Sequence, residues 1–157
     1  MERAAPIDGE VQAGRHREVE RLVYEFARRV DFDEGADTEL LFTEDGYFEY
    51  DGRSCTGRDE IGRAYAARRA RGPRTARHVF TNVSSFRDGR GALGGGSIML
   101  LFGADGRPPF DFASPIVVAD VADSYAAVGD TLLIARRVIT PLFIESSRPA
   151  VPPVGLR

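Results

Sequence analysis

The first part of the chain carries a helical pattern of apolar residues from about Glu10 onward. Its apolar positions recur at i, i+3, i+4, i+7 and i+11, and they are Val19, Leu22, Val23, Phe26 and Val30. This spacing predicts an amphipathic helix with one side facing a core. Tyr24 and Asp31 lie seven residues apart on one flank of that apolar stripe. A carboxylate beside an apolar face is a candidate functional group, although Asp31 also suits the start of the turn that reaches Gly35.

A short helix and a short strand are predicted next. Either Asp37 or Thr38 can cap the helix, which Asp45-Gly46 ends. The segment Tyr47–Tyr50 then alternates as a strand, and Asp51-Gly52 turns it.

A longer helix is predicted over residues 58–71. Thr56 suits its N-cap, Asp59 completes a pattern like a capping box, and Gly72-Pro73 ends the helix. Its inner face consists of Ile61, Ala64 and Tyr65. We expect its arginines to form a solvated face that also suits the helix C-terminus. They are Arg63, Arg68, Arg69 and Arg71.

The rest of the chain alternates in the manner of long β-strands. Four strands are predicted, at residues 75–87, 93–103, 115–127 and 131–144. Asp88-Gly89 and Gly129-Asp130 are predicted hairpin turns. Helices followed by such a meander predict an α+β fold, in which a curved antiparallel sheet wraps around the helices. Because strands this long must curl, we expect the sheet to form a cone-shaped (α+β barrel) pocket.

Length and charge narrow the picture further. We expect one domain of residues 10–147 between a flexible N-terminal tail, 1–9, and a Pro-rich C-terminal tail, 148–157. The 24 acidic and 21 basic residues give a net charge of −3. This balance favours neither nucleic acid nor a membrane as a partner. We expect a cytoplasmic protein, because no apolar run resembles a signal peptide or a membrane span.

Composition also excludes several kinds of chemistry. Every basic residue is arginine, so no lysine can form a Schiff base. Cys55 is the sole cysteine, which excludes an intrachain disulfide and a zinc site built from cysteines. His16 and His78 lie far apart in any plausible layout, so we expect no metal. A strand follows Gly94–Gly96 where a phosphate loop needs a helix, so we also expect no cofactor.

The strand that begins near Arg74 holds His78 among β-branched and aromatic residues. On a strand, His78, Phe80 and Asn82 share one face. A titratable ring, an aromatic wall and an amide suit a pocket better than a dry core. The alternative is a buried histidine that is bonded to a backbone carbonyl.

The predicted sheet has two faces, and the helices can cover only one of them. Four valines fall at positions that would form an apolar patch on the outer face, namely Val79, Val83, Val117 and Val121. A patch of that size favours a homodimer formed through the outer face of the sheet.

Several short motifs follow one another in an order typical of one superfamily. They are Asp31 after the first helix, LFTEDG at 41–46, TGRDEI at 56–61, Arg77-His78 with Asn82, and LIARR at 133–137. On these motifs, which extend over nearly the whole chain, it resembles the SnoaL-like domains of the nuclear-transport-factor-2-like (cystatin-like) superfamily. Those domains include polyketide cyclases and scytalone dehydratase.

The resemblance implies roles for particular residues. In dehydratases of this group, an aspartate at the end of the first helix works beside a pocket histidine, and tyrosines polarise the substrate carbonyl. By position, these catalytic roles fall to Asp31, His78 and Tyr50. The candidate substrate contacts are Tyr24, Phe80, Asn82, Tyr65 and Asp120. Asp111 and Asp123 are alternatives to Asp120 on the later strands.

Together these groups predict a cofactor-independent dehydratase or cyclase that works by general acid–base catalysis on a small apolar substrate. The expected substrate is a polyketide-like or other apolar carbonyl-containing natural-product intermediate. Two alternatives stay open. One is epoxide opening or ketosteroid-type isomerisation in the same pocket, and the other is a non-catalytic ligand-binding module. Epoxide opening would need two aspartates around an arginine, and the candidates are Arg28 or Arg136 with Asp31 and Asp120.

Overall fold

The computed structural model describes residues 9–111 and 114–147. The helical elements are α1 (Gly9–Phe32), the 3-10 helix η1 (Thr38–Leu41) and α2 (Arg58–Arg69). The strands are β1 (Phe42–Tyr50), β2 (Arg53–Thr56), β3 (Arg74–Arg87), β4 (Leu93–Asp105), β5 (Val117–Val128) and β6 (Thr131–Ile144). The predicted tails, 1–9 and 148–157, lie outside the described residues except for Gly9, which begins α1.

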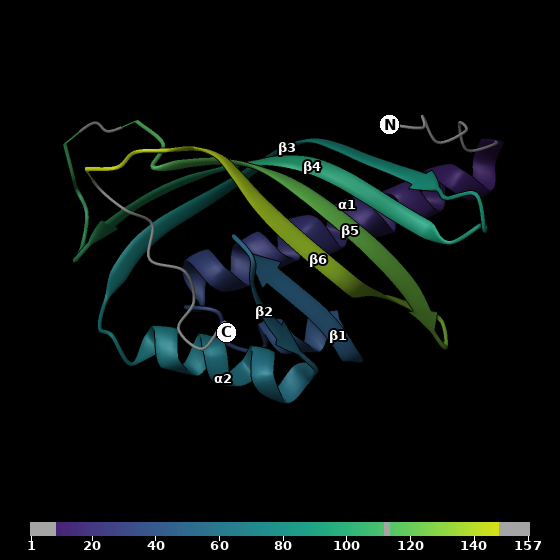
Figure 1. Cartoon of the computed structure of the whole chain (residues 1–157), viewed down its shortest axis with the longest axis horizontal. Coiled ribbons are helices and arrows are strands. Elements are labelled where there is room, and N and C mark those ends of the chain that lie inside the picture. The colour runs from purple at the N-terminus through teal and green to yellow at the C-terminus, as the bar shows by residue number, and fades with distance from the viewer. Residues whose placement is uncertain (1–8, 112–113, 148–157) are drawn as a thin grey trace.

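The strands form one curved sheet in the order β2-β1-β6-β5-β4-β3 (Figure 1). The predicted α+β class and curved sheet are confirmed, with two corrections. The sheet is mixed, because β1 runs parallel to its neighbour β6 while every other pair is antiparallel. It is also open, since β2 and β3 form its two edges. The reason is that the chain leaves β1 through β2 and α2 and crosses to the far edge before the meander begins.

The end of one predicted helix and the start of another need correction. The short helix is a single 3-10 turn that ends at Leu41, because Phe42 is already extended and opens β1. The N-cap of α2 is Gly57, not Thr56, and no side chain caps it. Thr56 belongs to β2, where its backbone N–H donates to Glu60 Oε2 at 2.8 Å.

The core lies between the sheet and α1, which packs on β3 and β6. The predicted helical stripe is buried throughout, and none of its five residues is more than 4% exposed. At its centre, the ring of Phe26 lies 6.1–6.5 Å from four other rings, those of Phe42, Phe48, Tyr65 and Phe80. Edge-to-face and tilted contacts of this kind add to the stability gained by burial. This aromatic cluster joins α1, α2 and both arms of the sheet.

A bulge in β3 changes which residues face the helices. The register with β4 shifts between Thr81 and Ser84, and Asn82 has a positive φ of 53°. Ala76 and Phe80 are buried before the bulge, whereas Val83 packs against the core after it. The strict alternation that placed Asn82 beside His78 and Phe80 is therefore wrong, because one extra residue turns the Asn82 side chain to solvent.

The predicted set of outward valines is also mostly wrong. Val117 and Val121 are 1% and 3% exposed, because the odd-numbered positions of β5 face the helices. Val83 faces inward after the bulge. Val79, at 46% exposed, is the one of the four that lies open on the outer face.

Candidate functional site

The last turn of α1 places Asp31 directly against β3 at His78. Asp31 Oδ1 lies 2.5 Å from His78 Nδ1, and Asp31 Oδ2 accepts the backbone N–H of His78 at 2.7 Å. The side chains are 4% and 12% exposed, respectively. Asp31 therefore does more than open the turn after α1, and His78 has a carboxylate partner where a buried histidine often has a backbone carbonyl. These two residues are called the dyad below.

The dyad geometry fixes the protonation pattern of the histidine ring. An ionised carboxylate can only accept hydrogen bonds, so the short contact requires a proton on Nδ1. Nε2 of a neutral ring then carries the free lone pair. Nε2 of His78 has no hydrogen-bond partner among the residues that the structure describes. This is the arrangement in which a carboxylate orients a histidine and stabilises the imidazolium that forms when Nε2 takes up a proton.

Two of the candidate substrate contacts, Phe80 and Tyr65, are buried in the interior. Phe80 follows His78 on the same face of β3 and is 7% exposed. Tyr65 is 2% exposed and stacks against Phe48 at 6.3 Å. Burial raises the pKa of Tyr65, which keeps its phenol protonated. Tyr65 also packs tightly on Gly35, where an added Cβ would lie 2.3 Å from the ring.

Tyr50 lies on the inner face of the sheet but away from the dyad. It ends β1, is 8% exposed and belongs to the core cluster. Three strands, β6, β5 and β4, separate β1 from β3 in the sheet. No contact between Tyr50 and either dyad residue occurs in the described structure. Burial raises the pKa of Tyr50, and the charge of Asp51 raises it further.

Three other candidates lie outside the interior. Tyr24 is 49% exposed because it falls on the solvent side of α1. Asn82 is turned outward by the β3 bulge. Asp120 is exposed on the outer face of β5, where it pairs in register with Ile98 and Thr140. These exposed positions contradict the prediction that Tyr24, Asn82 and Asp120 line an interior pocket.

The interior carboxylate of β5 is Asp123. Arg137 donates to it from Nε at 2.8 Å and from Nη2 at 2.6 Å, and Tyr125 donates its hydroxyl at 2.8 Å. The Arg137 guanidinium is fully buried and lies 4.4 Å above the Phe26 ring. Burial alone would lower the pKa of Arg137, but Asp123 raises it above its usual value. Asp123 has the same parity on β5 as buried Val121, and Asp120 has the opposite parity. Because Val121 was predicted to face outward, no signal in the sequence favoured Asp123.

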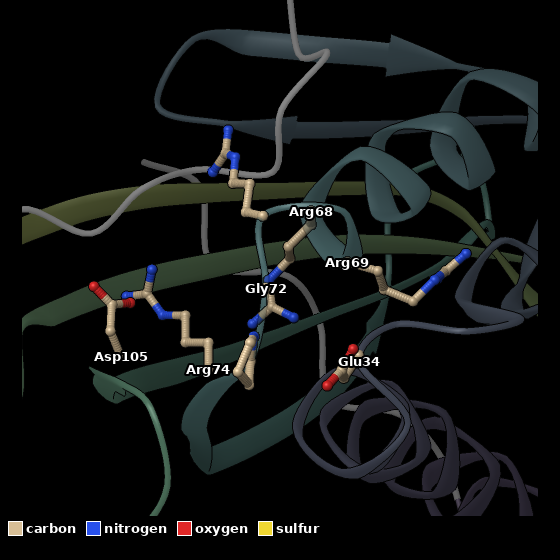
Figure 2. A pocket seen from close by; sticks show the side chains of 8 residues that line it. Glu34, Arg68, Arg69, Gly72, Arg74 and Asp105 are labelled. Carbon is tan, nitrogen blue, oxygen red and sulfur yellow. The ribbon is translucent and has the colours of Figure 1, made fainter.

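A cavity of about 390 Å³ lies between the ends of both helices and the start of β3, and neither dyad residue is among the described residues that line it. Glu34, three residues after Asp31, lies on its rim. Arg74 lines it from β3, four residues before His78. Arg68 of α2 reaches the C-terminal end of α1, where its Nη1 lies 3.5 Å from the Val30 carbonyl oxygen. Figure 2 shows how these side chains surround the cavity.

The second histidine lies elsewhere on α1. His16 Nδ1 is 2.9 Å from Ser85 Oγ, and His16 Nε2 is 3.7 Å from Glu20. Across the described residues, no group of three or more His, Cys, Asp or Glu is placed to hold a metal ion. In the same part of the chain, no helix combines the length and apolarity that a membrane crossing needs.

Comparison with solved structures places the fold among cystatin-like proteins. ActVI-ORFA from Streptomyces coelicolor is 22% identical, with a TM-score of 0.68 over 84% of this chain and 98% of that one. A protein from Novosphingobium aromaticivorans, provisionally assigned as a scytalone dehydratase, is 18% identical, with a TM-score of 0.73 over 92% and 95%. A protein from Catenulispora acidiphila, solved in complex with S-DNPA, is 25% identical, with a TM-score of 0.66 over 83% and 95%.

Sequence comparison gives the family. No functionally curated protein sequence matches the chain. The model of the SnoaL-like domain matches residues 12–138, which include most of α1, both dyad residues and every strand up to the middle of β6. The chain therefore belongs to the SnoaL-like domain family.

Proposed function

We propose that the protein is a cofactor-independent dehydratase or cyclase that acts by general acid–base catalysis on an apolar carbonyl compound of the polyketide type. The observation that carries the proposal is the dyad. Asp31 contacts both the backbone N–H and Nδ1 of His78, which leaves Nε2 available to take up a proton. Membership of the SnoaL-like family supports it. So does the similarity to ActVI-ORFA, to a provisional scytalone dehydratase and to a protein that holds S-DNPA, although such similarity fixes only the fold.

In the proposed first step, Nε2 of His78 removes a proton from the carbon next to the substrate carbonyl. The C–H electron pair forms an enolate, and the histidine ring becomes an imidazolium. Asp31, with 4% of its side chain exposed, stabilises that cation at short range and keeps the ring in place. A positioned base of this kind contributes about 10²–10⁴ in rate.

In the proposed second step, the imidazolium returns its proton. In a dehydration, the enolate expels the hydroxyl group on the neighbouring carbon, and His78 protonates it as it leaves as water. The C–O electron pair goes with the oxygen, and a C=C bond conjugated to the carbonyl forms. In a cyclisation, the same enolate carbon attacks a second carbonyl, and His78 protonates the new alkoxide. No external oxidant or reductant is needed in either reaction.

We assign to Tyr50 a hydrogen bond to a second polar group of the substrate, remote from the enolate, because three strands separate β1 from β3. The Tyr50 hydroxyl is on the inner face of β1, and its raised pKa keeps it in the donating form at neutral pH. A substrate that extends from His78 across the interior would meet this phenol at its far end. Tyr50→Phe should then lower turnover while His78 remains able to exchange the substrate proton with solvent.

The test uses bicyclic β-hydroxy ketones, with enone formation followed by absorbance. Asp31→Asn and His78→Gln should each lower turnover by about 10²-fold or more. The matched controls are Asp33→Asn and His16→Gln, which change the same residue types outside the dyad. Wild-type turnover in the dyad variants would refute the proposal. A complete lack of turnover on any carbonyl substrate, together with binding that survives in both dyad variants, would identify a binding module.

Epoxide opening has less support from the described residues. Arg28 is half exposed and pairs with Glu25 and Asp33 on the surface of α1. Arg136 lies over the ring of Tyr47 and is exposed. The interior arginine, Arg137, is held by one carboxylate and not by two. The aspartate–arginine–aspartate arrangement expected for an epoxide hydrolase of this fold is therefore not formed by these groups.

A further inference from the structure

The cavity between the helix ends and the start of β3 is lined by more arginines than acidic residues. Four arginines and two acidic residues are among its lining residues, namely Arg68, Arg69, Arg71 and Arg74 with Glu34 and Asp105 (Figure 2). The volume, about 390 Å³, lies within the range of small-molecule sites. These arginines were expected to form a solvated helix face, but the fold gathers Arg68, Arg69 and Arg71 with Arg74 from the next strand.

Arg68 is the innermost of these charges. Its side chain is partly buried and runs into the middle of the cavity lining, whereas the Arg69 side chain points away from it (Figure 2). Its one hydrogen bond within the described structure is the long contact to the Val30 carbonyl. Burial lowers the pKa of Arg68, and the nearby charge of Arg74 also lowers it. The charges of Tyr65, Asp31 and Glu34 raise that pKa in part, and an anion in the cavity would offset the two lowering effects further.

Arg74 approaches the same space from the sheet. It has the same parity on β3 as Ala76, His78 and Phe80, so it shares their inner face. Its guanidinium lies over Gly103 of β4, where an added Cβ would be 3.1 Å from Nη2. Glycine at this position therefore leaves room for the arginine to lie across the inner face.

No local carboxylate forms a close ion pair with either of these two arginines. Across the part of the chain that the structure describes, no carboxylate oxygen lies within 4.0 Å of the side-chain nitrogens of Arg68 or Arg74. Asp105 is the cross-strand neighbour of Arg74, and Glu34 lies on the rim. Stabilisation of the α2 C-terminus does not explain Arg68 either, because its Nη1 contacts a carbonyl of α1 and not one of α2.

We propose that Arg68 and Arg74 bind a carboxylate group of the substrate, which holds the apolar body of an acid against the dyad. This inference deepens the proposed function and rests on it for the identity of the reacting end. Guanidinium groups recognise planar carboxylates through paired hydrogen bonds, and two such groups around one cavity favour a single organic acid. Arg74 and His78 are four residues apart, which is about 13 Å along the strand. The Arg74 side chain is long enough to shorten that interval by extending toward His78. A two-ring acid with a short side chain can then contact both residues.

The test measures binding, so it does not depend on turnover. Naphthylpropanoic acid and its uncharged amide are titrated calorimetrically into wild type, Arg68→Gln, Arg74→Gln and Arg63→Gln. Arg63 is the matched control, since it is exposed on the same helix and donates to the Asp59 carbonyl outside this cavity. Inorganic phosphate is titrated in parallel to separate a carboxylate site from a phosphate site. Arg68→Lys tests whether charge alone is enough.

We expect the acid to bind wild type at least about 10-fold more tightly than the amide, with an affinity that falls as salt rises. Arg68→Gln and Arg74→Gln should each remove most of that preference, Arg68→Lys should keep part of it, and Arg63→Gln should keep all of it. Equal affinity for acid and amide would overturn the proposal. So would phosphate binding that depends on both arginines without acid binding. Thermal melts beside the titrations show whether a variant has lost its fold, and Arg68→Lys carries the test if Arg68→Gln has.

Failure here and failure of the proposed function give different results. If the acid binds through the arginines but the dyad variants keep turnover, the anion site stands and the catalytic assignment falls. If the dyad variants lose turnover but acid and amide bind alike, the catalytic assignment stands and the carboxylate site falls. Asp31→Asn should bind the acid at least as well as wild type, because it removes a negative charge that lies near Arg68.

Discussion

Asp31 holds His78 with both of its carboxylate oxygens, one on the ring nitrogen Nδ1 and one on the backbone N–H. The two contacts tie the last turn of α1 to the middle of β3, and they fix both the position of the histidine and the direction of its ring. A single contact to the ring would leave the strand free to shift relative to the helix. The two residues are therefore expected to act as one unit.

The first prediction follows from the expectation that Asp31 and His78 act as one catalytic unit. Asp31→Asn and His78→Gln should each lower turnover by about 10²-fold or more, and the double variant should be little worse than either single variant. Residues that act in one step are strongly non-additive, because the loss of one already removes the contribution of the other. The measurement is a set of rates for all three variants on one substrate. Additive losses would show that the two side chains act independently.

Stability measurements separate this prediction from a structural role. Asparagine can still accept the backbone N–H of His78, and neither change touches the buried stripe of α1. The melting temperatures of the variants should therefore stay close to that of wild type. Severe destabilisation of both single variants would indicate that the pair serves the fold.

The parts of this site that sequence could predict are those with a regular period. The stripe of α1 placed Asp31 at the edge of the core, and the parity of β3 placed His78 beside Phe80. The bulge after Thr81 follows no period, and it turned Asn82 outward and Val83 inward. Alternation along β5 separates Asp123 from Asp120, but it does not say which of the two faces the helices. The structure shows that the odd-numbered positions do. The arginine cluster could not be predicted, because it depends on how α2 and β3 meet α1 in space.

The second prediction concerns the buried pair Arg137 and Asp123. Asp123→Asn should destabilise the protein by about 3–5 kcal/mol, because it leaves a buried guanidinium without a counter-charge. Arg137 Nη1 already has no partner in the described structure, so the site has little capacity to absorb a further loss. Thermal or denaturant unfolding measures the change. Asp120→Asn is the matched control, since it alters an exposed aspartate on the same strand.

Removing both charges tests the reason for that loss. The double variant Asp123→Leu with Arg137→Met should be more stable than Asp123→Asn, because an apolar pair leaves no charge buried. If the double variant is less stable than the single one, packing of Arg137 on Phe26 matters more than its charge.

The third prediction is a pH dependence from the surface of α1. Hydrogen bonds from Arg28 and then Arg29 lower the pKa of Glu25 from 4.5 to about 2. A carboxylate with a lowered pKa in the folded state stabilises the fold above its unfolded pKa, and that contribution is lost as the pH falls from about 4.5 to about 2. The melting temperature of wild type should exceed that of Glu25→Gln at pH 7, and the difference should shrink as the pH approaches 2. Glu44→Gln, an exposed change, should show no such convergence.

The fourth prediction is a homodimer formed through the outer face of the sheet. Of the four valines first considered, it keeps Val79 and replaces the other three. Val79, Leu100, Val118 and Phe143 are successive register partners across β3, β4, β5 and β6. They form an apolar row, called the outer row here. Val79 and Phe143 at its two ends are 46% and 69% exposed. A row of this kind on a solvent-facing sheet is a typical interface, and a two-fold axis through the sheet would place the row against its own copy.

Sedimentation at micromolar concentration should give twice the chain mass of 17.2 kDa for wild type. Val79→Asp and Phe143→Asp should each give a monomer, because a carboxylate at either end of the outer row would be buried against the apolar surface of the other protomer without a partner. Val128→Asp is the matched control, since Val128 is 55% exposed but lies at the β5–β6 turn, outside the outer row. All three variants should keep the wild-type melting profile at concentrations where wild type is also monomeric. A monomeric wild type, or a dimer that survives both substitutions in the outer row, would show that this face is not the interface.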